Sequence, residues 1–158
     1  MNAATLTILK RTTLFAGLDE ASLATLSDFC EIQDFQDGQK AISENNDVGR
    51  QDLFLLIGGS VSVGAKFVPL ETAAEASLQG IDNELYGEIA FLLSTKRSAG
   101  ITCKGRTRFL KINGEKLNAF MLDNPTIGFL LMDRIAKVLA QRVIKLTDQL
   151  KSQKMFDF

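Results

Sequence analysis

The 158-residue sequence predicts an α+β fold in which helices flank an antiparallel sandwich or barrel of short strands. Apolar residues recur at helical spacing near the N-terminus and again from about residue 125 onward. Between these regions the period changes to two, in short runs that turn residues separate. Several short strands at such intervals are typical of a sandwich or a barrel.

Two helices are expected between about residue 5 and residue 29. The first ends at Gly17, which interrupts the helical spacing. Asp19 is a suitable N-cap for the second helix, because its carboxylate can accept a hydrogen bond from the unpaired amides of the first turn. The apolar residues that these helices contribute are Leu6, Leu9, Leu14, Phe15, Leu23, Leu26 and Phe29.

Short strands are expected from about residue 30 to residue 112. The pair Gly58-Gly59 predicts a turn between two of them, and Gly105 predicts a break between two others. The stretch 66–85 is read as a hairpin or loop. The predicted strand segments lie at about 32–35, 41–42, 53–57, 61–63, 101–104 and 106–112.

Two helices complete the chain, and Pro125 fits the first turn of the second one. This last helix is expected to run from about residue 125 to residue 150 or beyond, a length of about 35–40 Å. Its apolar stripe suits core packing, but the helix is long enough to offer its far half to a partner. The residues of the stripe are Leu131, Ile135, Val138, Leu139, Val143, Leu146 and Leu150.

The composition excludes several functions. The net charge is −1, with 18 basic and 19 acidic residues, and nothing indicates an electrostatic contact with DNA or with a membrane. The chain has no histidine, which excludes Ser-His-Asp and Cys-His catalysis and removes the commonest metal ligand. We therefore expect neither an enzyme nor a metal site.

Cys30 and Cys103 lie far apart in the sequence, so buried free thiols in a reducing compartment are expected. No apolar run approaches the roughly twenty residues of a membrane span, and the N-terminus lacks a secretory hydrophobic core. The sequence therefore predicts a cytoplasmic protein.

The stretch around residues 87–99 carries the chemistry. Gly87-Glu88-Ile89-Ala90 opens a short apolar helical turn, and Arg97-Ser98-Ala99 follows nine residues after the acid. Unpaired amides at a helix start and a guanidinium fork both bind phosphate oxygens. Glu88 would repel a phosphate, so it is better explained as an acceptor for sugar hydroxyls. A nucleotide phosphate carries both groups, although Glu88 and Arg97 could instead form an ordinary surface ion pair.

These residues resemble the phosphate-binding cassette of the cyclic nucleotide-binding domain family. The resemblance implies an antiparallel β-roll, or jelly roll (double-stranded β-helix), with N-terminal helices and a long C-terminal helix. It also implies that residues 1–158 form one such domain. Its expected parts are helices at about 5–29, a β-roll at about 30–112 that contains the cassette 87–99, and helices at about 114–154.

The resemblance also implies roles for individual residues. Glu88 would bind the ribose 2′-hydroxyl, Arg97 and Ser98 would bind the cyclic phosphate, and backbone amides around Gly87, Ala90 and Ala99 would surround it. Ile89 belongs to the same turn. The implied ligand is cAMP or cGMP, and Ser98 weakly favours cAMP.

In the family the last helix closes over the nucleotide and often forms a dimer seam. Val138 and Arg142 occupy positions where bacterial members place polar residues against the purine. Val138 cannot donate a hydrogen bond to a base. Arg142 could stack on a purine or bond its ring nitrogens, and an exposed helix arginine is an equally good interpretation.

The resulting hypothesis is a regulatory module that signals through movement of its last helix, either to a second copy in a homodimer or to a separate effector protein. Only eight residues follow Leu150, so no direct contact with nucleic acid is expected. The alternative is an interaction or scaffold protein on the same fold that binds no nucleotide.

Overall fold

The computed structural model describes residues 2–42, 52–64, 72–76, 85–95, 97 and 100–156. The helices within these residues are α1 (Ala3–Arg11), the 3₁₀ helix η1 (Thr13–Phe15), α2 (Glu20–Ser27), α3 (Glu88–Leu93), α4 (Gly114–Asp123) and α5 (Pro125–Phe156). The strands are β1 (Cys30–Phe35), β2 (Lys40–Ile42), β3 (Leu53–Gly64), β4 (Thr72–Ala76), β5 (Leu85–Tyr86) and β6 (Gly100–Ile112).

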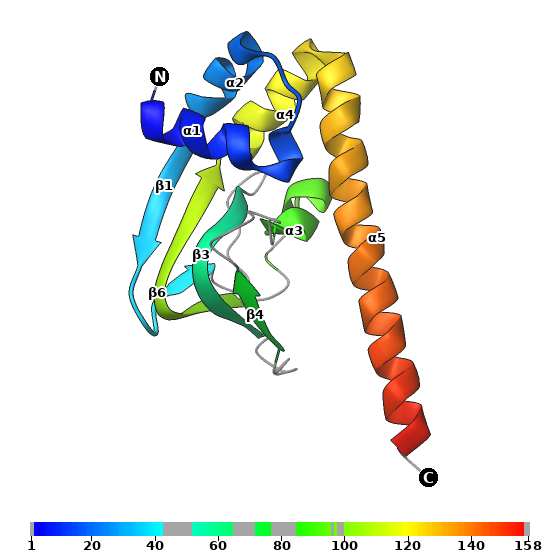
Figure 1. Cartoon of the computed structure of the whole chain (residues 1–158). Helices are drawn as coiled ribbons and strands as arrows, with labels where there is room; N and C mark the ends of the chain where they lie inside the picture. The colour runs from blue at the N-terminus through cyan, green and yellow to red at the C-terminus, as the bar shows by residue number, and fades with distance from the viewer. Residues whose placement is uncertain are drawn as a thin grey trace.

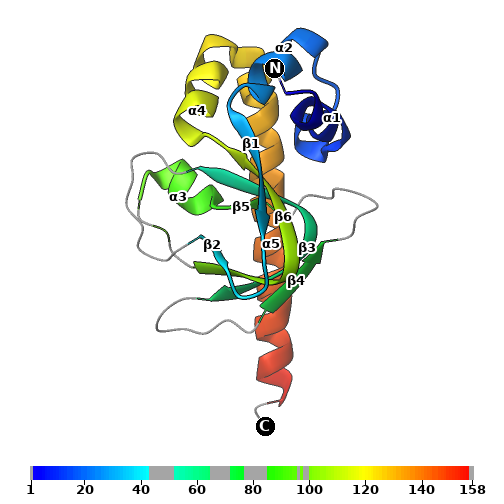
Figure 2. The ribbon, with the colours of Figure 1, turned by 90° about the vertical axis from the view of Figure 1, so that its left-hand side faces the viewer.

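The strands form an antiparallel sheet with β6 and β3 at its centre. Its main path is β1-β6-β3-β4, while β2 pairs with β6 and β5 pairs with β3. Figures 1 and 2 show the sheet curling into a roll, with α1, α2 and α4 gathered at one end of it. This arrangement confirms the predicted α+β class, in which helices flank antiparallel strands.

The N-terminal caps explain where the helices begin. The carboxylate of Asp19 accepts a 2.8 Å hydrogen bond from the amide of Ser22, and this bond lowers the pKa of Asp19. Asn113 accepts in the same way from the amide of Lys116, at 3.0 Å. The predicted role of Asp19 as an N-cap is confirmed.

The predicted turn at Gly58-Gly59 is wrong, because β3 runs without a break from Leu53 to Gly64. Gly59 has a φ of +94°, and the register with β6 shifts on both sides of Gly58. The two glycines therefore bend one long strand instead of separating two short ones.

The predicted break at Gly105 is also wrong. Strand β6 is continuous from Gly100 to Ile112, and Gly105 lies inside it with a φ of +69°. The amide of Gly105 donates to Asp37, which lies in the turn after β1. The stretch 66–85 is predicted as a hairpin or loop. Within it, β4 pairs antiparallel with β3, whereas residues 66–71 and 77–84 lie outside the described residues.

Strand β3 separates two hydrophobic cores, because its successive side chains point to opposite faces. Leu53 and Leu55 face the helices, and Phe54 and Leu56 face the inside of the roll. The helix-side core also contains Leu9, Phe15, Leu26, Leu85, Phe91, Leu110, Leu117, Leu131 and Ile135. The interior core also contains Ile42, Val61, Tyr86, Ile101, Cys103 and Phe109.

Helix α5 has 32 residues, which corresponds to a length of about 48 Å. Its first half packs on the roll, and its C-terminal end extends past it (Figure 1). Leu131 and Ile135 are therefore buried, whereas Val143 and Leu150 are each 61% exposed. No helix within the described residues has the length and apolar character that a bilayer crossing requires.

Cys30 and Cys103 are free thiols, as predicted. Burial raises the pKa of Cys30 to about 12 and also raises the pKa of Cys103. Both sulfurs therefore stay protonated near neutral pH.

Candidate functional site

The site begins at Gly87, which lies between β5 and α3. Gly87 has a φ of +83°, and its carbonyl accepts the first hydrogen bond of α3, from Phe91 at 3.1 Å. A Cβ at this position would lie 2.4 Å from Nη1 of Arg97 and 2.8 Å from the carbonyl oxygen of Asp52. A glycine is therefore needed both for the backbone conformation and for the close approach of Arg97.

Arg97 is buried, with 6% of its surface exposed. Its Nη1 donates to the carbonyl of Gly87 at 3.1 Å, and its Nη2 donates to the carbonyl of Asp52 at 2.8 Å. The guanidinium also lies 5.8 Å from the ring centre of Phe54, on the interior side of β3. Burial lowers the pKa of Arg97, while the charges of Asp52 and Glu88 act in the opposite direction.

The charge of Arg97 has no direct anionic partner in the part of the chain that the structure describes. Within the described residues its guanidinium forms no ion pair, and its two hydrogen bonds go to uncharged carbonyl groups. A guanidinium has five N–H donors and remains charged in proteins. The site therefore holds a buried cation with donor capacity left for an anion.

Glu88 is 7% exposed and is bound to the last helix. Its Oε1 accepts a 2.6 Å hydrogen bond from Nη1 of Arg142, and Nη2 of Arg142 donates to the carbonyl of Leu85. The guanidinium of Arg142 lies 5.5 Å from the ring centre of Tyr86. Arg142 is thus not a solvated helix arginine. The alternative prediction, an ion pair between Glu88 and Arg97, is not observed, because the ion pair that Glu88 forms is with Arg142.

The predicted site residues fall into three groups. Gly87, Glu88, Arg97 and Arg142 come together between α3, the roll and α5. In the first turn of α3, Ala90 is buried, whereas Ile89 is 42% exposed. Ser98 and Ala99 lie outside the described residues.

Asp52 is a further residue of the site, and the sequence did not predict it. Its main-chain carbonyl accepts from Arg97, and its side chain accepts from the amide of Gly114 at 2.9 Å at the start of α4. Lys111 lies 3.5 Å from the same carboxylate. Asp52 therefore fixes Arg97 to the end of the roll, and only its place directly before an apolar strand marked it in the sequence.

The Glu88–Arg142 contact is expected to stabilise the folded chain. A double-mutant cycle with Glu88→Gln and Arg142→Met should give a coupling energy of about 1–3 kcal/mol in urea denaturation, because both side chains are largely withdrawn from water. The exposed pair Arg108–Asp34 provides the control, for which a smaller coupling is expected. Equal coupling energies in the two cycles would show that Arg142 does not hold α5 to α3.

Comparisons with known proteins place this geometry in a fold family. No family model matches the chain. The cAMP-activated global transcriptional regulator of Mycobacterium tuberculosis, a CRP-like protein, is 23% identical over 143 residues, which cover 90% of this chain. The chain spans 60% of the length of that relative.

Solved structures agree on the fold. A putative cyclic nucleotide-binding protein from Geobacter metallireducens superposes with a TM-score of 0.73 at 20% identity, over 90% of this chain and 99% of that one. The regulatory subunit of a cAMP-independent protein kinase A from Trypanosoma brucei superposes with a TM-score of 0.70 at 17% identity, over 92% of this chain and 48% of that one. The chain has the fold of the cyclic nucleotide-binding domains, a β-roll with a long C-terminal helix, as the cassette resemblance predicts.

Proposed function

We propose that this chain is a cyclic nucleotide-binding regulatory module. The observation that carries the proposal is the buried Arg97, which has no anionic partner within the described residues and lies beside the buried carboxylate of Glu88. A cyclic phosphate would neutralise the guanidinium, and the attached ribose would meet the carboxylate. One nucleotide thus supplies an anion for Arg97 and a ribose that takes the place of Arg142 at Glu88.

The proposed ligand contacts follow the cassette. Arg97 and Ser98 bind the phosphate together with amides around Gly87, Ala90 and Ala99. The CRP-like relative is described as cAMP-activated, which favours cAMP over cGMP. The exposure of Ile89 gives its side chain no part in the pocket, so only its amide contributes.

The proposed output is a change in how α5 docks. In the structure Arg142 of α5 binds Glu88, the carboxylate that the ribose would use. A nucleotide that takes this carboxylate releases Arg142 or rearranges it, and α5 shifts to the extent that the ligand binds one position of the helix more tightly. Arg142 is then available to the purine.

A thermal-shift experiment with cAMP, cGMP and 5′-AMP tests the proposal. A ligand at about 100 times its dissociation constant stabilises a protein by about 2.7 kcal/mol. We expect a clear upward shift with a cyclic nucleotide and none with 5′-AMP, whose phosphate carries a second charge and no ring. An unchanged melting temperature with every nucleotide would contradict the proposal.

A second candidate function is an interaction module that binds no nucleotide. Two observations favour it: Glu88 already has a partner in Arg142, and a structural neighbour is described as cAMP-independent. In this case the Glu88–Arg142 contact is a permanent part of the fold. The thermal-shift experiment separates the two candidates.

The proposed partner of α5 is a second copy of the chain. One stripe of α5 alternates steps of three and four residues, the spacing of a coiled-coil seam. Val143, Leu146 and Leu150 on this stripe are 61%, 53% and 61% exposed. The stripe consists of Phe129, Met132, Ala136, Leu139, Val143, Leu146 and Leu150.

Two acidic substitutions on this stripe are expected to prevent dimerisation. With Val143→Glu and Leu150→Glu together, sedimentation should give the 17.3 kDa monomer, where the unchanged chain gives twice that mass. Like charges buried at a helix seam repel each other and lose their hydration. Asp148→Lys, on the outward face of the same turns, should leave the dimer intact. A monomeric unchanged chain would rule out this partner.

A further inference from the structure

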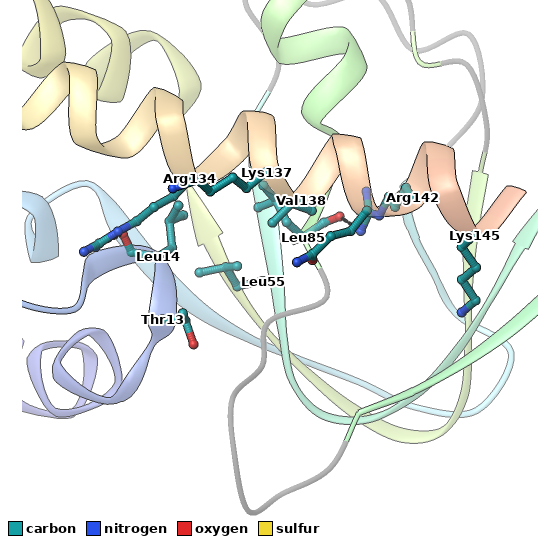
Figure 3. Close-up of a pocket in the computed structure, with 10 residues that line it drawn as sticks. Thr13, Leu14, Leu55, Leu85, Arg134, Lys137, Val138, Arg142 and Lys145 are labelled. Atoms are coloured by element: carbon teal, nitrogen blue, oxygen red, sulfur yellow. Dashed lines mark hydrogen bonds between the residues drawn. The ribbon is translucent and has the colours of Figure 1, made fainter. Parts of the chain in front are cut away.

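A cavity lies between α5, η1 and the helix-facing side of β3 (Figure 3). It has a volume of about 620 Å³, within the range of roughly 300–1,000 Å³ that is typical of small-molecule sites. It is bounded by η1, by the helix-facing side of β3 and β5, and by α5 (Figure 3). Leu55 and Leu85 line it and belong to the helix-side core, whereas Arg97 stacks on Phe54 in the interior. The leucine side of the cavity therefore lies on the opposite face of β3 from Arg97, and the cavity meets the proposed nucleotide site at Arg142.

One part of the cavity is apolar. Leu14 of η1, Leu55 of β3 and Leu85 of β5 form its floor, and Val138 of α5 closes it from above. Val138 is the helix residue whose apolar side chain does not suit a purine. An apolar side chain in this place does suit the hydrocarbon part of a ligand.

The other part of the cavity is cationic. Arg134, Lys137, Arg142 and Lys145 line it from one face of α5, and none of the described lining residues is acidic. Figure 3 shows these side chains along the helix beside the apolar floor. The arrangement contrasts with the whole chain, whose net charge is −1.

Two of these four charges are offset by neighbouring acids. Lys137 pairs with Asp133 at 2.8 Å, and Arg142 pairs with Glu88 at 2.6 Å. Arg134 donates only to the carbonyl of Leu14, and Lys145 forms no ion pair within the described residues. Counted over the described residues, the cavity thus keeps an excess of two positive charges.

We infer that this cavity binds an amphipathic organic anion, with an aliphatic chain on the leucine floor and a carboxylate at the lysine and arginine side chains. Burial of the chain supplies the affinity, and the charges orient the ligand. Because Arg142 borders the cavity and also binds Glu88, a ligand there contacts the residue that joins α5 to α3. The inference does not depend on nucleotide binding.

Calorimetric titration of the whole chain with octanoate tests this inference. We expect saturable binding of one octanoate per chain. Butyrate, which has the same charge and a shorter chain, and octanol, which has the same chain and no charge, should each bind more weakly. Absence of saturable octanoate binding, or equal binding of the neutral alcohol, would overturn the inference.

Matched variants locate the site. The double change Lys137→Gln and Lys145→Gln should weaken octanoate binding about tenfold, because two exposed charges that line the cavity are lost. Lys151→Gln, on the same helix but outside the cavity, should leave binding unchanged, and Val138→Phe should fill the cavity and abolish it. Arg97→Ala should keep octanoate binding. Equal effects of the lysine double change and of Lys151→Gln, or loss of octanoate binding on Arg97→Ala, would refute the assignment.

Discussion

Replacing Arg97 by alanine is expected to weaken cyclic nucleotide binding by about 2–5 kcal/mol, or roughly 30- to 5,000-fold. The large effect follows from burial: with 6% of Arg97 exposed, water cannot replace the lost guanidinium beside the phosphate. Isothermal titration of the unchanged chain and of the Arg97→Ala variant with cAMP and cGMP measures the loss of affinity. The nucleotide affinity of Arg97→Lys should lie between those of the unchanged chain and of Arg97→Ala, since lysine keeps the charge but loses the planar fork.

Arg108→Ala is the matched control for this change. Arg108 is an exposed arginine of β6 whose ion pair with Asp34 lies away from the site. Its removal should leave nucleotide binding unaltered. If Arg97→Ala bound the nucleotide as tightly as Arg108→Ala does, Arg97 would have no role as the phosphate anchor.

Replacing Gly59 by alanine is expected to cost about 3–4 kcal/mol of folding free energy. Gly59 has a φ of +94°, which disfavours any residue with a Cβ. A Cβ there would also lie 2.4 Å from the carbonyl oxygen of Arg106 and 2.8 Å from the Cα of Thr107. Both are backbone atoms of β6, so the two central strands would have to separate.

Gly105→Ala separates the two causes of this loss. Gly105 also has a positive φ, of +69°, but nothing lies within 4 Å of the position that a Cβ would occupy. This change should therefore cost only the backbone strain, about 1–2 kcal/mol in urea denaturation. Equal losses for the two variants would mean that the contact between β3 and β6 at Gly59 does not constrain the fold.

These two glycines also show where sequence reasoning failed in the fold. A glycine between apolar runs has the same local signature at a turn and at a bend inside a long strand. The difference at Gly59 depends on the backbone of Arg106 and Thr107, which lie more than forty residues later. By contrast, Asp19 was predicted correctly as a cap because its partner Ser22 is three residues away.

In the candidate site, too, the contacts between residues close in the sequence were predictable and the distant ones were not. The cassette was found because its residues are close in the sequence and have a characteristic order. The contacts of Arg97 with Asp52 and of Glu88 with Arg142 join residues 45 and 54 positions apart, so no spacing could reveal them. The sequence left Arg142 with two interpretations, as a purine contact or as an exposed arginine. Its contact with Glu88 argues against the exposed arginine, and the purine contact stays a prediction.

Helix α5 was predicted as a helix with one broad apolar stripe, but its apolar residues have two destinations. Leu131 and Ile135 pack into the helix-side core, whereas Val143 and Leu150 are exposed. Helical periodicity identifies the stripe, but it does not tell which of its residues the rest of the chain covers. The tertiary structure decides which residues are left for a partner.

The structure of the chain bound to cAMP would test the nucleotide proposal most directly. We expect the cyclic phosphate at the guanidinium of Arg97 and the ribose at the carboxylate of Glu88, with Arg142 moved from that carboxylate. The opposite result is a chain that, at saturating cAMP, keeps Arg97 bound only to the carbonyls of Gly87 and Asp52 and keeps Glu88 on Arg142, with no nucleotide between them.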